Sequence, residues 1–194
     1  EGGKPAEALD RLGYAEVAVA RAGSDVLREE LLVVRSDVLV SLGRYADARA
    51  ALEAARASIE ARAAGSTYAA GRVTSRLASV LYEMGENDAA LELDRKTLAL
   101  WTETLGPEHP KVGQILNNVA IRLDENGRHQ EARRLLERSL SIKERTLGAE
   151  HPSVAFALHN LGMVIGHLGH DAESATLNER ALALREKVLG RDHP

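Results

Sequence analysis

The sequence contains no cysteine, five prolines in 194 residues and only 3% aromatic residues. Without cysteine the chain can form neither a disulfide framework nor a thiolate metal site, which favours an intracellular, cytoplasmic setting. Hydrophobic residues nevertheless make up 44% of the chain, so Ala, Leu and Val must fill the core in place of large rings. Small side chains of this kind indicate closely packed helices.

Neither sign of charge dominates, since the formal net charge is -4 with 28% charged residues. This balance gives no strong attraction to nucleic acid or to an anionic membrane surface. No apolar run approaches the roughly 18 residues that span a bilayer, and the run Leu31 to Val34, for example, is far too short. We therefore expect neither nucleic acid nor membrane as a partner.

Enzyme motifs are missing as well. The sequence has no Gly-rich phosphate loop, no G-x-S-x-G, no H-E-x-x-H and no cysteine nucleophile. The carboxylates fall at spacings typical of solvated helix surfaces. We therefore expect no enzyme activity, no catalytic residue and no cofactor.

One phrase, Leu-Gly-x-x-His-Pro, occurs three times, and each copy begins 42 residues after the last, at Leu105, Leu147 and Leu189. Residues 105–146 and 147–188 align without a gap and share 15 of 42 positions. A fixed period of this length is typical of a stacked repeat architecture.

A second glycine extends the same period through four units: Gly43, Gly85, Gly127 and Gly169. Each unit is predicted as a helix A, a turn at this glycine, and a helix B, because glycine takes the positive φ past a helix end at little cost. The glycine of the phrase ends helix B, and Pro110 and Pro152 begin the next helix A. Ser24 or Asp25 is expected to cap the first helix A.

The period predicts a single solenoid over residues 1–194. Residues 1–25 are a partial repeat, mainly helix B, and the full repeats cover 26–67, 68–109, 110–151 and 152–194. Both ends look cut, so we expect a piece of a longer protein. The excess of Arg over Lys favours a bacterial, GC-rich origin.

The pattern of small and large residues around each helix-turn-helix resembles the tetratricopeptide repeat. The 42-residue length, the repeated phrase and Leu116-Asn117-Asn118-Val119-Ala120 are most similar to the kinesin-light-chain type, chiefly over residues 85–194. The resemblance implies an all-α, right-handed α-solenoid in which helices A line a concave groove that binds a protein or peptide partner.

The resemblance also gives the groove positions. In the first repeat they include Glu30, Val33, Asp37 and Val40, in the second also Ser75, Ser79, Tyr82 and Glu83, in the third also Glu125, and in the fourth also His167. The predicted partner-binding residues are Arg72, Arg76, Gln114, Asn117, Asn118, Ile121, Asp124, Phe156, His159, Asn160 and Met163.

Physical reasons support some of these positions. An Asn carboxamide can match either backbone group of an extended peptide. The alternative is that Asn117, Asn118 and Asn160 hydrogen-bond between neighbouring helices A and position the stack. Arg72 and Arg76, one turn apart, suit an acidic partner side chain, whereas Asp124 would prefer a basic one.

Histidines invite a metal interpretation, which the spacing disfavours. His109, His151 and His193 recur once per repeat, too far apart for ligand bonds of about 2 Å, so loop packing or helix capping is expected. His159 and His167 are separated by about 12 Å of helical rise, and with His170 they predict no shared metal. Trp101 is expected to be a packing residue.

Two alternatives to a peptide-binding module stay open. The first is a regulatory or substrate-recruiting C-terminal region of a bacterial serine/threonine protein kinase or another multidomain signalling protein. The second is a structural element that self-associates through exposed solenoid ends.

Overall fold

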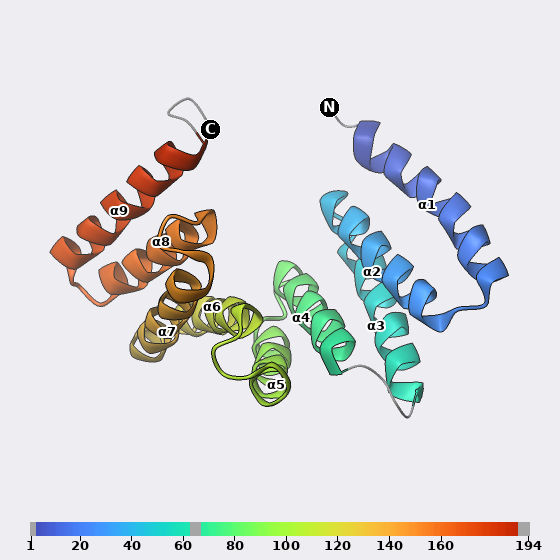
Figure 1. The fold of residues 1–194 in the computed structure, drawn as a ribbon, viewed down its shortest axis with the longest axis horizontal. Helices are drawn as coiled ribbons and strands as arrows, with labels where there is room; N and C mark the ends of the chain where they lie inside the picture. Colours follow the sequence, from blue (N-terminus) through green and yellow to red (C-terminus); the bar gives the residue numbers. More distant parts are fainter. Residues whose placement is uncertain (1–2, 63–66, 190–194) are drawn as a thin grey trace. The chain divides into compact units, whose positions relative to one another are not determined.

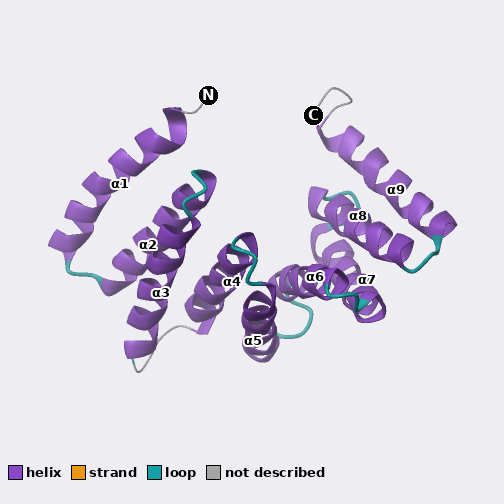
Figure 2. Ribbon diagram, turned by 180° about the vertical axis from the view of Figure 1, so that it is seen from behind, coloured by secondary structure: helices purple, strands orange, loops and turns teal. Residues whose placement is uncertain are grey.

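The computed structural model describes residues 3–62 and 67–189, which form nine α-helices and no strand (Figures 1 and 2). In chain order the helices are α1 Gly3–Ala22, α2 Asp25–Ser41, α3 Tyr45–Ala61, α4 Thr67–Glu83, α5 Asn87–Leu105, α6 Pro110–Glu125, α7 His129–Leu147, α8 Pro152–His167 and α9 Asp171–Leu189. None of the helices in these ranges is both long and apolar enough to cross a bilayer.

The chain groups into two compact units, residues 1–97 and 98–194, with the boundary inside α5. In the first unit α1 packs on α2, α2 on α3, and α3 on α4. In the second unit α6 packs on α7, α7 on α8, and α8 on α9. The predicted repeats from residue 26 onward each span one helix pair, and a single solenoid across the unit boundary stays a prediction.

The turn between the two helices of each pair is made by a glycine with positive φ, as predicted. The φ angles are 70° at Gly43, 80° at Gly85, 73° at Gly127 and 80° at Gly169. Each glycine N–H donates to a carbonyl in the last turn of the preceding helix, as Gly43 does to Val40 at 2.9 Å. Gly106 and Gly148 also have positive φ, whereas Gly190 lies outside the described residues.

The histidines of the first two copies of the phrase, His109 and His151, cap helices, as predicted. The Nδ1 atoms of His109 and His151 accept the backbone N–H two residues on, each at 3.1 Å, while Pro110 and Pro152 begin α6 and α8. Ser24 caps α2 with its hydroxyl oxygen, which accepts the backbone N–H of Leu27, three residues on. His193 lies outside the described residues.

Small residues bring the two helices of a pair close together. Ala120 on α6 and Ala132 on α7 are fully buried, and Ser139 donates from α7 to the carbonyl oxygen of Gly113 on α6 at 2.6 Å. A Cβ built on Gly113 would lie 3.0 Å from a methyl carbon of Ile142. The repeated small residues therefore set how closely α6 and α7 approach.

Trp101 is a core residue, which confirms its predicted packing role. It is buried in the second unit and clusters with Val112, Ile115, Leu116 and Ile142. Because the chain has one tryptophan, its fluorescence reports on this unit alone.

Candidate partner-binding surfaces

The first unit carries two pockets between α2 and α4, and both include predicted groove positions. The larger, about 340 Å³ and here called the Asp37 pocket, is lined by Ser36, Asp37, Val40, Leu52, Arg76, Ser79, Val80 and Glu83. The smaller, about 270 Å³ and here called the Arg72 pocket, is lined by Val26, Glu29, Glu30, Ile59, Arg62, Ala69, Arg72 and Val73.

The two predicted arginines are engaged with acidic residues of α2. The Arg72 guanidinium donates to the Glu30 carboxylate at 2.8 Å, and Arg76 forms an ion pair with Asp37. An acidic partner side chain would therefore have to compete with carboxylates already in place. This cost reduces the net gain from binding one.

The Asp37 carboxylate is incompletely compensated. Burial raises its pKa above the ordinary value, although the nearby Arg76 and Arg72 guanidinium groups act in the opposite direction. The Asp37 pocket also contains Glu83, so it holds two carboxylates against one guanidinium. Its local charge therefore favours a basic group.

The lining of the Arg72 pocket includes a buried carboxylate, Glu29, that the sequence pattern did not indicate. Glu29 accepts from Ser58 at 2.7 Å and from Arg62 at 2.6 Å, and it lies almost wholly out of contact with solvent. The lining of the pocket therefore holds two carboxylates, Glu29 and Glu30, and two guanidinium groups, Arg62 and Arg72. It has no evident preference for a charged partner group.

In the second unit, Asn117 on α6 and Asn160 on α8 hydrogen-bond to each other. The Asn160 side-chain amide donates to the Asn117 Oδ1 at 2.9 Å, and both residues are only 5% exposed. This arrangement is the stacking role that sequence analysis left open as the alternative. A direct contact of either side chain with a partner stays a prediction.

The other predicted positions of this unit are more accessible. Asn118 and Ile121 are half-buried on α6, and Gln114 is exposed. On α8, Phe156 is 60% exposed and Met163 is 42% exposed, while the His159 Nδ1 lies 3.1 Å from the Oδ1 of Asn178 on α9. The α8 helix thus presents two large apolar side chains to solvent.

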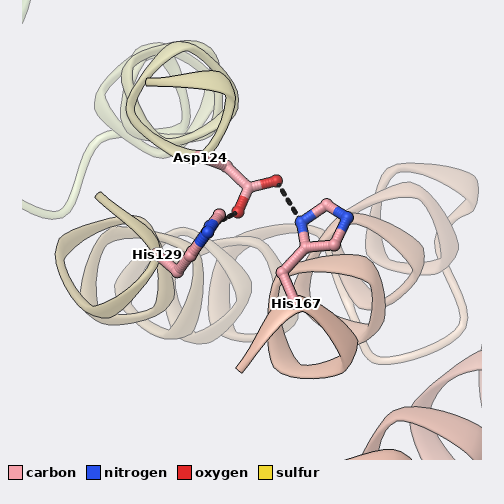
Figure 3. Close-up of side chains that lie close together, drawn as sticks. All are labelled: Asp124, His129 and His167. Atoms are coloured by element: carbon pink, nitrogen blue, oxygen red, sulfur yellow. Dashed lines mark hydrogen bonds and ion pairs between the residues drawn. The ribbon is translucent and has the colours of Figure 1, made fainter. Parts of the chain in front are cut away.

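Asp124 does not stand open to a partner. Its side chain is only 8% exposed, and its two carboxylate oxygens face the rings of His129 and His167 (Figure 3). The sequence pattern did not single out His129, and it placed His167 among the groove positions and beside His159 and His170. The only signal was their common position beside the turn glycines Gly127 and Gly169.

A sequence model described as tetratricopeptide repeat matches residues 69–145 and 123–187. Together these matches cover more than half of the chain, which therefore belongs to the tetratricopeptide repeat family. The fold of this family is generally a non-catalytic scaffold for interactions with other proteins. No curated protein sequence is significantly similar to the chain.

Solved structures confirm the fold class. BtubC (BKLC) from P. vanneervenii superposes with a TM-score of 0.82 at 21% identity, covering 98% of this chain and 75% of that one. A crystal structure of a Podosopora anserina putative kinesin light chain with nearly identical TPR-like repeats gives 0.77 at 26% identity, covering 97% and 90%. The chain has the all-α fold class of solenoids built from tandem helix-turn-helix repeats, and it is similar to the kinesin-light-chain type.

A third similar structure is a Rap protein complexed with competence and sporulation factor. Its TM-score is 0.72 at 17% identity, and the match covers 84% of this chain and 44% of that one. At this identity the likeness concerns the fold alone.

Proposed function

We propose that this chain is a protein-interaction module that holds an extended segment of a partner protein against helices A of the first unit. The observation that carries the proposal is the Asp37 pocket. Five of the groove positions that the family resemblance implies, Asp37, Val40, Arg76, Ser79 and Glu83, line one hollow of about 340 Å³ between α2 and α4.

The size of this pocket suits side chains rather than a whole small molecule. Ligand sites for small molecules range from about 300 to 1,000 Å³ and are mostly enclosed. A volume near the lower limit, open on one side, accommodates one or two side chains of a peptide that runs on along the surface. Val40, Leu52 and Val80 supply the apolar part of its wall.

The charge of the pocket selects the kind of segment. Asp37 and Glu83 outnumber Arg76, and a partner cation would compensate the Asp37 carboxylate, whose pKa is raised by burial. A charge-assisted hydrogen bond to a carboxylate is stronger than a neutral one. The favoured partner is therefore an extended peptide with an apolar side chain beside a basic one.

The test is a selection of random peptides on the 194-residue chain, followed by fluorescence anisotropy of the selected peptides. The selected sequences are expected to combine a basic and an apolar residue. The variant Ser79→Tyr fills the pocket mouth and is expected to weaken their binding at least tenfold.

Ser41→Tyr is the matched control. Ser41 on α2 and Ser79 on α4 are both exposed, and each hydroxyl donates to a carbonyl oxygen of the preceding turn, but only Ser79 lines the Asp37 pocket. Ser41→Tyr is expected to bind as the wild type does. Equal binding by Ser79→Tyr and wild type would place the interaction elsewhere and refute the proposal.

The fold allows such a role, since a Rap protein with this architecture has been solved in complex with competence and sporulation factor. The regulatory region of a signalling protein and the self-associating structural element stay predictions.

A further inference from the structure

We propose that Asp124, His129 and His167 form a binding site for a transition-metal dication of the Zn²⁺ class. The side chains come from three helices of the second unit: Asp124 from the last turn of α6, His129 from the first residue of α7, and His167 from the end of α8 (Figure 3). One potential ligand atom from each residue lies within 4.8 Å of the other two.

The two imidazole rings converge on one carboxylate. The Nδ1 of His129 lies 2.6 Å from Asp124 Oδ1, and the Nδ1 of His167 lies 2.9 Å from Asp124 Oδ2. The ring centroids are 5.3 Å apart with planes at 51°, so the rings are splayed rather than stacked. Their Nδ1 atoms therefore point into a common space at the carboxylate, as Figure 3 shows.

The distances fit a metal after a small movement. Bonds of about 2.0–2.2 Å place neighbouring ligand atoms of a tetrahedral site roughly 3.3 Å apart. Each Nδ1–oxygen distance would therefore open by less than about 1 Å. In the metal-bound state each ring is the neutral tautomer with its proton on Nε2 and its Nδ1 lone pair on the metal. A proton held on Nδ1 before binding leaves to solvent, and Nε2 takes one up.

The exposure of the side chains leaves room for a further ligand. The Asp124 side chain is 8% exposed, whereas those of His129 and His167 are 32% and 54% exposed. The carboxylate is thus fixed by burial, and the imidazole groups can adjust from the solvent side. A water molecule can complete the coordination.

The donor set determines the class of metal. Two imidazole nitrogens and one carboxylate suit Zn²⁺ and its neighbours such as Co²⁺, Ni²⁺ and Cu²⁺. Mg²⁺ and Ca²⁺ prefer sites made of oxygen ligands, so this arrangement is a poor one for them.

Repeat stacking alone does not require these residues. The positions 84 residues earlier, two periods back, lie at the corresponding helix ends of the first unit and carry Val40, Tyr45 and Glu83. There Val40 and Tyr45 pack against the hydrophobic core. The same junction thus carries Val, Tyr and Glu in the first unit, and two histidines around a buried Asp in the second.

The experiment is isothermal titration calorimetry of Zn²⁺ into the untagged, metal-free 194-residue chain at neutral pH. One Zn²⁺ per chain is expected. His129→Ala and His167→Ala are each expected to weaken binding at least tenfold. His159→Ala, which removes an exposed histidine of α8 outside the cluster, is expected to bind as the wild type does.

Two further readouts keep the test independent of folding defects. Co²⁺ is expected to give the visible d–d bands of a tetrahedral site in the wild type and not in His167→Ala, whose replaced ring is the more exposed of the two. Zn²⁺ is expected to raise the melting temperature of the wild type, because binding only the folded state stabilises it.

The inference is wrong if the wild type binds no Zn²⁺, if both cluster variants retain wild-type affinity, or if Mg²⁺ binds as tightly as Zn²⁺. In those cases the three side chains act only as a hydrogen-bonded clasp between α6, α7 and α8.

Discussion

The Asn117–Asn160 hydrogen bond gives the sharpest test of how the second unit is held together. Asn160→Ala removes the donor and leaves the Asn117 Oδ1 unpaired in a site where both residues are 5% exposed. An unsatisfied buried polar group costs about 1–3 kcal/mol. We expect Asn160→Ala to lower the free energy of unfolding by that amount.

Urea unfolding followed by the fluorescence of Trp101 is the suitable assay, because this single tryptophan lies in the core of the same unit. Gln114→Ala is the control, since it removes an exposed carboxamide from α6 and is expected to change stability by less than about 0.5 kcal/mol.

A double-mutant cycle completes the test. Once Asn160 is replaced, Asn117→Ala no longer breaks a hydrogen bond, so the double variant is expected to lose less stability than the sum of the single ones, by about 0.5–1.5 kcal/mol. Strict additivity, or an Asn160→Ala effect no larger than that of Gln114→Ala, would refute the reasoning.

Two further predictions concern packing and burial. Gly113→Ala is expected to destabilise by about 1–3 kcal/mol, offset by roughly 1 kcal/mol of helix propensity, because its Cβ would meet Ile142 at 3.0 Å. Gly13→Ala, with nothing within 4 Å, is expected to stabilise the first unit by up to about 1 kcal/mol. Urea midpoints measured by helical circular dichroism that are equal for the two variants would contradict this. Burial lowers the pKa of Lys143 below 10.5, so its charged form costs stability at neutral pH and the cost fades as pH rises toward that value. Lys143→Met is therefore expected to raise the melting temperature most at neutral pH and less in alkali, and a pH-independent difference would be evidence against this account.

The helices and their ends could be predicted from the sequence because the signals are local and periodic. Gly127 ends α6 through its own positive φ, and His151 caps α8 with a side chain that accepts the backbone N–H of Ser153, two residues on. A 42-residue period then repeats these signals without knowledge of tertiary structure.

The interactions of the predicted site residues could not be read from the sequence in the same way. Arg76 pairs with Asp37, and Asn160 with Asn117, across 39 and 43 residues. Which side chains meet depends on the register of one helix A against the next, and this register is set by packing. A period gives the repeated position of a residue but not its neighbour.

The same reasoning explains the missed cluster. His129 is on a helix B, so a search for groove residues on helices A passes over it, and Asp124 and His167 belong to different repeats. Only the packing of α6, α7 and α8 brings the three side chains together.

The central claim, that a partner segment lies against α2 and α4, is tested most directly by photo-cross-linking. A selected peptide whose apolar residue is replaced by benzoylphenylalanine would be irradiated on the chain, and the attachment sites mapped by mass spectrometry. Cross-links to residues that line the Asp37 pocket, such as Val40 and Val80, are the expected result. Cross-links confined to helices that do not line this pocket, α1 and α5 to α9, would contradict the account.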